Sequence, residues 1–257
     1  MNTFTTVGVG GTKVLLLPGL FGANEAFDAM LAFADTERFQ YVVMDYRGYG
    51  RAKNLSGLYT LNEVVADAIR LLDHLRWDQA HLLGHSIGAL VGQMIAVAAP
   101  GRIRSIVSLA GMNARGASRD PARMRMLDEA AHHVSQRAAV IHMGVGKRYG
   151  MAFAQQVSQS AWEAIAPQAC ADYAADAALT DIHTQVDGSE IPLLALVGAH
   201  DPGCTEQLAR DTTLRWYRNA ILEVVSDAGH YPMIEAPART LAAVETFLRS
   251  VSKTSGQ

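Results

Sequence analysis

The feature that most constrains this chain is the segment Gly84–Gly88, which reads Gly-His-Ser-Ile-Gly. An apolar run with the composition of a β-strand, Ala80–Leu83, precedes it, and a helix-forming run, Ala89–Ala96, follows it. A chain that passes from a strand into a helix within one residue turns sharply, which exposes the apex side chain and requires very small neighbours. The apex residue is Ser86, beside free N–H groups at a helix start that can stabilise an oxyanion. The same pattern also occurs in tight turns that contain a serine by chance, so the flanking strand and helix determine whether it indicates a nucleophile.

The length and composition are those of a globular protein. The 257 residues suffice for one large α/β domain or two small ones, and 49% of them are hydrophobic against 18% charged. The formal net charge of −3 provides no basic field, so neither nucleic acid nor a membrane is an expected partner. No apolar run approaches the roughly 18 residues that suggest a membrane span. We expect a small-molecule substrate as the partner, and the sequence leaves the oligomeric state open between monomer and homodimer.

The N-terminus and the cysteines favour a cytoplasmic protein. Residues Met1–Thr6 lack the basic start and the long apolar block of a signal peptide. Cys170 and Cys204 are the two cysteines, and no spacing pattern pairs them, so two reduced thiols is the simplest interpretation. Cytoplasmic localisation is the expectation that follows.

Strand-like segments alternate with helical segments along most of the chain, which predicts parallel strands joined by right-handed crossovers. The capping-box sequence Thr60–Glu63 marks one helix start, and Gly8–Gly11 is interpreted as a hairpin turn between the first two strands. The strands are expected at Phe4–Val7, Lys13–Leu17, Gln40–Asp45, Ala80–Leu83, Ile103–Ala110, Ile191–Gly198 and Ala220–Val225, and the helices at residues 25–34, 61–75, 89–96, 206–216 and 240–251.

The region between the fifth and sixth strands has a different character. From about residue 113 to about residue 190 it is rich in Ala, Met, Gln, Arg and His, with helical periodicity and no convincing strand. It carries too many apolar residues for a disordered linker, which indicates a helical insertion. The predicted organisation is an α/β core made of residues 1–112 and 191–257, with a helical cap or lid over residues 113–190.

Three polar side chains follow predicted strands: Ser86, Asp201 and His230. The carboxyl ends of parallel strands meet at one edge of a sheet, which brings such loops together. A serine hydroxyl is a weak nucleophile and needs a base, and an imidazole base needs a carboxylate to fix its tautomer. The order Ser, Asp, His is that found around a nucleophile elbow. Asp201 before Pro202 could instead initiate a turn, and Asp227 is a rival acid, although its place near His230 suits organising that loop.

Together these residues resemble the α/β-hydrolase fold enzymes that use a serine nucleophile. The resemblance covers most of the chain outside the cap. It implies a mostly parallel central sheet with helices on both faces, and a catalytic triad of Ser86, His230 and Asp201. A serine at position 86 excludes the dehalogenase and epoxide-hydrolase branches, which need an aspartate nucleophile. The segments that carry the resemblance are Leu17–Leu20, Asp45–Gly50, Gly84–Gly88, Val197–Asp201 and Ala228–His230.

The resemblance also implies an oxyanion hole. In this family the oxyanion is held by the backbone N–H after the nucleophile, here Ile87, and by one in the first loop, here Leu20, with Phe21 as the alternative. The chain departs from the family pattern at three places. Pro18 stands where the first loop of the family commonly has histidine. Arg51-Ala52 follows the segment Asp45–Gly50, where the family commonly has a serine. The N-terminal region is also short, so one or both of the family's first strands are expected to be reduced.

The activity that the resemblance implies is cleavage of a carboxylic ester-like bond through an acyl-enzyme. Esters, thioesters and lactones of small hydrophobic substrates are the expected substrates, with neither a cofactor nor a metal ion. The same scaffold can run carbon–carbon bond hydrolysis, lyase chemistry or acyl transfer, or serve as a weakly catalytic ligand receptor, so those alternatives stay open. The side chains expected in the substrate pocket are Phe21, His85, Met112, Trp162 and Tyr231.

Two further expectations concern charge. The cap shows no basic cluster that demands an anionic substrate, although its arginines leave one open: Arg115, Arg119, Arg123 and Arg125. A histidine base near its unperturbed pKa of roughly 6.5 predicts a rate that falls in mild acid.

Overall fold

A computed structural model describes residues 2–254, with the side chains of residues 253 and 254 left out. Its centre is a seven-stranded sheet in the order β1-β3-β2-β4-β5-β6-β7. All neighbouring strands run parallel except β1, which is antiparallel to β3. The predicted mostly parallel α/β architecture is therefore confirmed. The strands are β1 (Phe4–Val7), β2 (Thr12–Leu17), β3 (Phe39–Met44), β4 (Ala80–His85), β5 (Ile103–Leu109), β6 (Leu193–Gly198) and β7 (Ala220–Val225).

The predicted hairpin between the first two strands is wrong. Strand β1 pairs with β3, and β2 lies on the other side of β3. The connecting loop crosses the beginning of β3, where the Val9 N–H donates to Thr36 O at 2.9 Å and the Gly10 N–H donates to Phe39 O at 3.2 Å. A Cβ on Gly10 would lie 2.0 Å from a backbone carbon of Arg38, so the glycine permits this close crossing.

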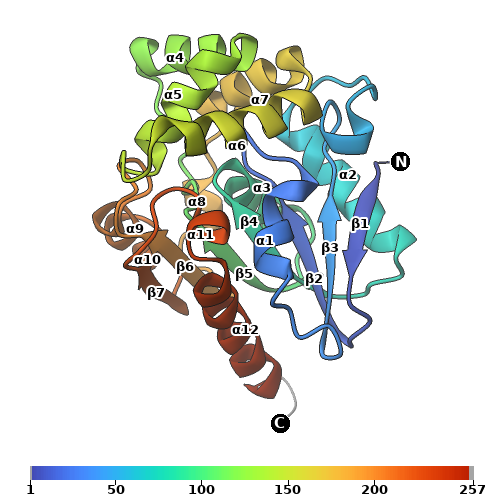
Figure 1. Cartoon of the computed structure of the whole chain (residues 1–257). Helices are drawn as coiled ribbons and strands as arrows, with labels where there is room; N and C mark the ends of the chain where they lie inside the picture. The colour runs from blue at the N-terminus through green and yellow to red at the C-terminus, as the bar shows by residue number, and fades with distance from the viewer. Residues whose placement is uncertain (1, 255–257) are drawn as a thin grey trace.

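Helices cover both faces of the sheet, as predicted (Figure 1). Helices α1 (Asp28–Leu31) and α12 (Pro237–Thr254) pack together on one face, and α2 (Leu61–His74) and α3 (Ile87–Ala98) pack together on the other. Helix α2 begins at the predicted cap, where the Thr60 hydroxyl accepts the Glu63 N–H at 3.2 Å. Helix α3 is apolar and buried on almost every side because it lies between the sheet and α2.

Three predicted helices differ from the structure by three residues at an end or by an interruption, and the other two by at most two residues at an end. The first is shorter and starts as a 3₁₀ turn, Asn24–Phe27, that leads into α1. The segment predicted as one helix over residues 206–216 forms α9 (Glu206–Asp211) and α10 (Thr213–Trp216), because Thr212 leaves the helical conformation between them. A short helix, α11 (Pro232–Glu235), directly precedes α12, which begins before the predicted start at residue 240.

A layer of helices lies across the carboxyl edge of the sheet, and we refer to residues 113–190 as the cap (Figure 1). The whole of this range is described, and it contains isolated bridge residues but no β-strand. None of the described helices is long and apolar enough to cross a bilayer. The cap helices are α4 (Pro121–His132), α5 (Val134–Gly144), α6 (Met151–Ala164), α7 (Pro167–Leu179) and α8 (His183–Val186).

Polar contacts tie the cap to the core on the side of α2. The Ala166 N–H donates to Gly48 O at 2.8 Å, and the Tyr173 hydroxyl donates to Arg47 O at 3.1 Å. The Leu61 N–H, in the first turn of α2, donates to the Asp176 carboxylate at 2.7 Å. Backbone groups of the core thus find hydrogen-bond partners in the cap, which packs over the carboxyl edge of the sheet.

Candidate active site

The turn between β4 and α3 has the geometry that the Gly-x-Ser-x-Gly pattern predicts. Ser86 has φ 53° and ψ −117°, outside the regions that L-residues ordinarily occupy. A Cβ on Gly84 would lie 2.3 Å from Gly88 O, and a Cβ on Gly88 would lie 2.2 Å from Leu17 O. Only glycine fits at these two positions, and their absent side chains let the strand, the turn and the helix approach closely.

The strained conformation of Ser86 leads to a prediction about stability. We expect the free energy of unfolding of the Ser86→Gly variant to exceed that of Ser86→Ala by about 1 kcal/mol, because glycine tolerates the positive φ. Ser86→Gly should therefore unfold at a higher urea concentration. Both variants lack the hydroxyl, so the comparison isolates the backbone. Equilibrium urea denaturation of the two proteins measures this difference. A Ser86→Gly protein that is no more stable than Ser86→Ala would show that the turn stores no strain.

Ser86 lies at the point where the strand order of the sheet reverses. Strands β2 and β4 are neighbours, while the chain continues from β2 to β3 on one side and from β4 to β5 on the other. Loops at such a switch point diverge and leave a crevice where α/β proteins bind ligands. The loop after β2 packs directly on the turn, since a Cβ on Gly19 would lie 2.4 Å from His85 Nδ1.

The backbone around this crevice offers free donors. Within the part of the chain that the structure describes, the N–H groups of Leu20 and Ile87 donate to no protein acceptor, and the same holds for Phe21. Ile87 is the first residue of α3, where N–H groups lack intrahelical partners. These donors lie beside Ser86 and are suited to bind an oxyanion. The geometry leaves both Leu20 and Phe21 available as the donor from the first loop.

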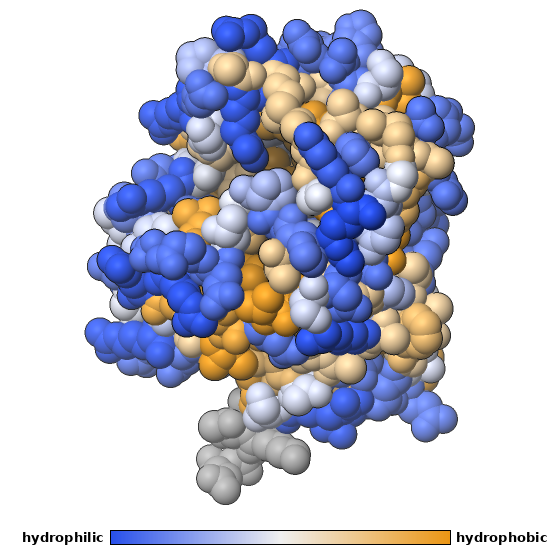
Figure 2. Space-filling model, turned by 60° about the vertical axis from the view of Figure 1, so that its left-hand side comes forward, coloured by the Kyte–Doolittle hydropathy of each residue, from blue (hydrophilic) through white to orange (hydrophobic). Residues whose placement is uncertain are grey.

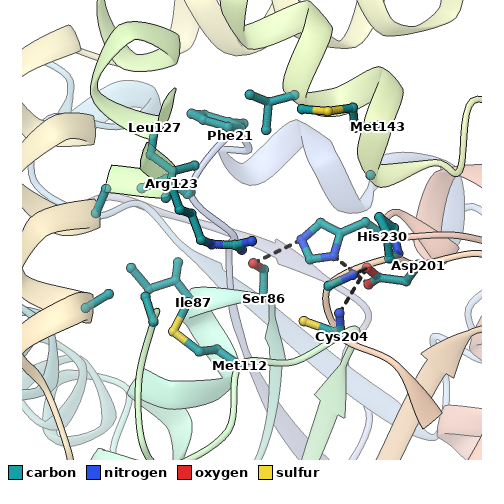
Figure 3. Close-up of a pocket in the computed structure, with 18 of the residues that line it drawn as sticks. Phe21, Ser86, Ile87, Met112, Arg123, Leu127, Met143, Asp201, Cys204 and His230 are labelled. Carbon is teal, nitrogen blue, oxygen red and sulfur yellow. Dashed lines mark hydrogen bonds and ion pairs between the residues drawn. The ribbon is translucent and has the colours of Figure 1, made fainter. Parts of the chain in front are cut away.

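The three predicted polar residues meet at the carboxyl edge of the sheet (Figure 3). The His230 Nε2 atom lies 3.1 Å from the Ser86 Oγ, and the His230 Nδ1 atom lies 2.7 Å from Asp201 Oδ2. The Asp201 Oδ1 atom accepts the backbone N–H groups of Gly203 at 2.8 Å and Cys204 at 3.0 Å. A hydroxyl, an imidazole and a carboxylate thus form one continuous hydrogen-bonded series.

The protonation of this series follows from its contacts. Burial disfavours the charged form of both side chains, but the carboxylate and the imidazolium stabilise each other. The pKa of Asp201 is lowered by His230 and by the two backbone N–H donors in spite of burial, so the carboxylate stays ionised. The same attraction outweighs burial at His230 and raises its pKa to about 10.

A second histidine buttresses the imidazole. His85 is buried, and its Nε2 lies 2.7 Å from the backbone oxygen of His230, to which it donates as a neutral imidazole. Burial, and next the charge of His230, lower the pKa of His85 to about 3. His85 therefore stays neutral at ordinary pH and holds the backbone of His230 in place.

Glu235 is a functional candidate that the sequence analysis missed. Its carboxylate accepts the backbone N–H groups of Gly229 and Tyr231, each at 2.9 Å, on both sides of His230. Arg148, from the cap, pairs with the same carboxylate at 3.1 Å. In sequence Glu235 looks like an ordinary acidic residue at a helix end, so no local pattern reveals this role. The rival acid Asp227 instead faces solvent and pairs with Arg239 at 3.3 Å.

Removing the charge of Glu235 is expected to slow catalysis without removing any reacting group. In Glu235→Gln one amide replaces a carboxylate that binds two backbone N–H groups, so the loop of His230 shifts. We expect kcat to fall about tenfold to a hundredfold, as for small displacements of reacting groups. Steady-state kinetics on one ester measure the effect, with Glu223→Gln, exposed on β7, as the control. Equal kcat for the two variants would contradict a positioning role.

A cavity of about 290 Å³ opens above Ser86, between the core loops and helices of the cap. Of the predicted pocket residues, four line it: Phe21, His85, Met112 and Tyr231. Seven further lining residues are apolar and come from the cap: Ala117, Met126, Leu127, Val140, Met143, Ala174 and Ala177. In the space-filling view, a recess with a hydrophobic floor and hydrophilic sides is visible in the upper part of the molecule (Figure 2).

Trp162 is not among the residues that line this cavity, contrary to the prediction. Its ring stacks on the guanidinium of Arg137, 5.1 Å away, and Phe21 lies on the same guanidinium at 5.2 Å. Arg137 is fully buried and donates to the backbone oxygens of Ala130 and Ala131 near the end of α4. Trp162 therefore packs inside the cap, around a buried arginine whose orientation the sequence does not reveal.

One group of side chains near the cavity has the composition of a metal site. Asp201, Cys204 and His230 each offer a ligand atom, and these atoms lie within 4.8 Å of one another. Asp201 and His230 are already hydrogen-bonded to each other at 2.7 Å. The acid–imidazole pair accounts for their proximity, so the cluster gives no independent indication of a metal ion.

Comparison with known proteins places the chain in a family. The sequence profile described as the α/β hydrolase fold matches residues 12–237. The chain therefore belongs to the α/β hydrolase fold family. The protein shares 26% identity over 254 residues with 3-oxoadipate enol-lactonase 2 of Acinetobacter baylyi, which covers 96% of this chain and 92% of that one.

Other similarities are shorter in sequence or more distant. RutD of Azorhizobium caulinodans, provisionally assigned to carbamate hydrolysis, is 35% identical over 101 residues, or 39% of this chain and 38% of RutD. The chain thus matches well under half the length of that relative. The structure of an esterase (EaEST) from Exiguobacterium antarcticum superimposes with a TM-score of 0.86 at 16% identity, covering 96% of this chain and 95% of that one. At that identity the similarity shows the fold alone.

Proposed function

We propose that the protein hydrolyses a carboxylic ester-like bond through an acyl-enzyme on Ser86. The observation that carries the proposal is the hydrogen-bonded series Ser86–His230–Asp201 at the floor of an apolar cavity. In the first step the Ser86 Oγ attacks the carbonyl carbon, and His230 takes its proton and gives it to the leaving group. In the second step water attacks the acyl carbonyl while His230 takes its proton, and His230 then gives that proton to the Ser86 Oγ as the carboxylic acid leaves.

The remaining groups act on the charge that develops in these steps. Asp201 holds the His230 tautomer in which Nε2 faces the serine, and it stabilises the imidazolium. The negative charge on the carbonyl oxygen is stabilised by the backbone N–H groups of Ile87 and of Leu20 or Phe21. These N–H groups have no other partner among the described residues.

The size and lining of the cavity support a small, largely hydrophobic substrate. Its volume of about 290 Å³ is at the lower end for ligand pockets, and its walls are mainly apolar. The relative from Acinetobacter baylyi that aligns along nearly the whole chain is named an enol-lactonase. Lactones therefore belong among the candidate substrates together with open-chain esters and thioesters.

A substrate panel tests this proposal. Purified enzyme is assayed with p-nitrophenyl esters of increasing acyl length, with small lactones, and with a dienone substrate for carbon–carbon bond cleavage. We expect turnover of short esters or lactones, and a kcat/KM that falls as the acyl chain outgrows the cavity. Turnover of the dienone without any ester or lactone turnover would overturn the ester-hydrolase proposal in favour of carbon–carbon bond cleavage.

The pKa of His230 leads to a pH-dependent prediction. His230 acts as a base only when unprotonated, and Asp201 raises its pKa in the unliganded protein above the ordinary value. As the pH falls through that pKa the base is lost, so we expect kcat/KM to decline toward acid with an apparent midpoint above roughly 6.5. The midpoint thus lies at higher pH than the sequence alone suggests. Measuring kcat/KM from pH 5 to 9 tests this, and a flat profile would contradict His230 as the base.

A further inference from the structure

One arginine, and no lysine, is among the described residues that line the mainly apolar cavity. Arg123, in the first turn of α4, extends from the cap so that its guanidinium points toward Ser86 and His230 (Figure 3). A Cβ on Gly203 would lie 4.0 Å from the Arg123 Nη2, which places the guanidinium beside the loop that carries the acid. In the sequence Arg123 is one of several arginines in the cap, and the structure distinguishes it from the others by its place in the cavity.

No group in the described part of the protein neutralises this guanidinium. The Asp120 carboxylate is used as the N-cap of α4, where it accepts backbone N–H groups. The one carboxylate among the lining residues belongs to Asp201, whose two oxygens are taken by His230 and by backbone N–H groups. Two arginines earlier in the cap have partners: Arg115 lies over the Trp216 ring and Arg119 donates to Ala178 O.

We propose that Arg123 binds a carboxylate of the substrate, so that the enzyme prefers esters or lactones that carry a negative charge a few atoms from the scissile carbonyl. A guanidinium presents paired N–H donors that match the two oxygens of a carboxylate. The apolar walls then hold the carbon chain between that carboxylate and the carbonyl over Ser86. This inference rests on the proposed function and specifies its substrate class.

The test compares charged and neutral substrates of matched size. In one arm, the p-nitrophenyl monoesters of dicarboxylic acids of increasing length are each paired with the corresponding methyl ester, which lacks the charge. In the other arm, 4-acetoxybenzoic acid is paired with its methyl ester, which places the charge on the leaving group. Uncatalysed hydrolysis is subtracted for every substrate, and kcat/KM is measured for the wild type, Arg123→Gln, Arg123→Lys and Arg125→Gln.

We expect the wild type to prefer the charged member in at least one arm by about tenfold, the lower part of the range for a charge-assisted hydrogen bond at a solvent-exposed group. Arg123→Gln should lose this preference while keeping its kcat/KM for neutral esters, and Arg123→Lys should retain part of it. Arg125→Gln alters an exposed arginine of the same helix that does not line the cavity, so it should behave as wild type. Added salt should weaken the preference.

The outcomes separate this inference from the proposed function. No charge preference in either arm, or a preference that persists in Arg123→Gln, overturns the role of Arg123 while leaving ester hydrolysis intact. A fall in kcat for neutral esters in Arg123→Gln also overturns it, since that result assigns the guanidinium to the oxyanion. Loss of all Ser86-dependent turnover on every ester would instead count against the proposed function itself.

Discussion

Replacing Ser86 by alanine is expected to reduce kcat for a short p-nitrophenyl ester by at least about 10⁴-fold. The Ser86 Oγ is the atom 3.1 Å from His230 Nε2, and no other hydroxyl of the described residues lies in this series. Without it no acyl-enzyme forms, and the turnover that remains comes from binding and from the oxyanion donors, about 10³–10⁴-fold over water. Steady-state kinetics measure the loss, at an enzyme concentration high enough to detect the remaining activity.

The control for Ser86→Ala is Ser135→Ala, an exposed serine on α5. Ser86 lies in a strained turn, so a substitution there can change the stability of the protein. Circular dichroism and thermal melts are therefore used to check that both variants are folded. Ser135→Ala should match the wild type in kcat. A Ser86→Ala enzyme within a few fold of the wild type, with both proteins folded, would exclude an acyl-enzyme on this residue.

Replacing Asp201 by asparagine is expected to lower kcat about 10⁴-fold, because the carboxamide cannot hold the His230 tautomer that serves the serine. The two backbone N–H groups that bind Asp201 Oδ1 can still bind the amide oxygen, so the loop keeps its shape. With the carboxylate gone, the pKa of His230 should also drop, and the acid limb of kcat/KM should move to lower pH. Kinetics across the pH range measure both effects on one protein.

The matched comparison for Asp201→Asn is Asp227→Asn. Asp227 is the rival acid of the sequence analysis, and in the structure it pairs with Arg239 at the surface. Its variant should retain wild-type kcat and pH dependence. If Asp227→Asn were the variant that lost activity while Asp201→Asn kept it, the roles assigned to the two acids would have to be exchanged.

Much of the fold could be predicted because it follows local rules. Continuous apolar runs marked the buried parallel strands, and the capping sequence at Thr60 marked the start of α2. The turn at Ser86 was predictable because only glycine fits at positions 84 and 88. Once parallel strands were inferred, the convergence of Ser86, Asp201 and His230 at one edge of the sheet followed from topology.

The errors arose where long-range packing decides the structure. Strand β1 and strand β2 are consecutive, which favours a hairpin, but β3 lies between them in the sheet. Trp162 was assigned to the substrate pocket from its hydrophobic character, whereas the buried guanidinium of Arg137 holds it inside the cap. Glu235 pairs with Arg148 of the cap and Arg123 lies beside Gly203, and both contacts join residues distant in sequence, so neither side chain could be distinguished from an ordinary surface charge.

The most direct test of the account is labelling with a fluorophosphonate probe, followed by intact mass measurement and peptide mapping. Such probes react with serines that a neighbouring base activates. We predict one adduct per chain, located on Ser86, and labelling that is slowed strongly in His230→Ala although the serine is present. A protein that forms no adduct on Ser86, or that labels equally fast without the imidazole, would contradict the claim that this series of side chains is a catalytic centre.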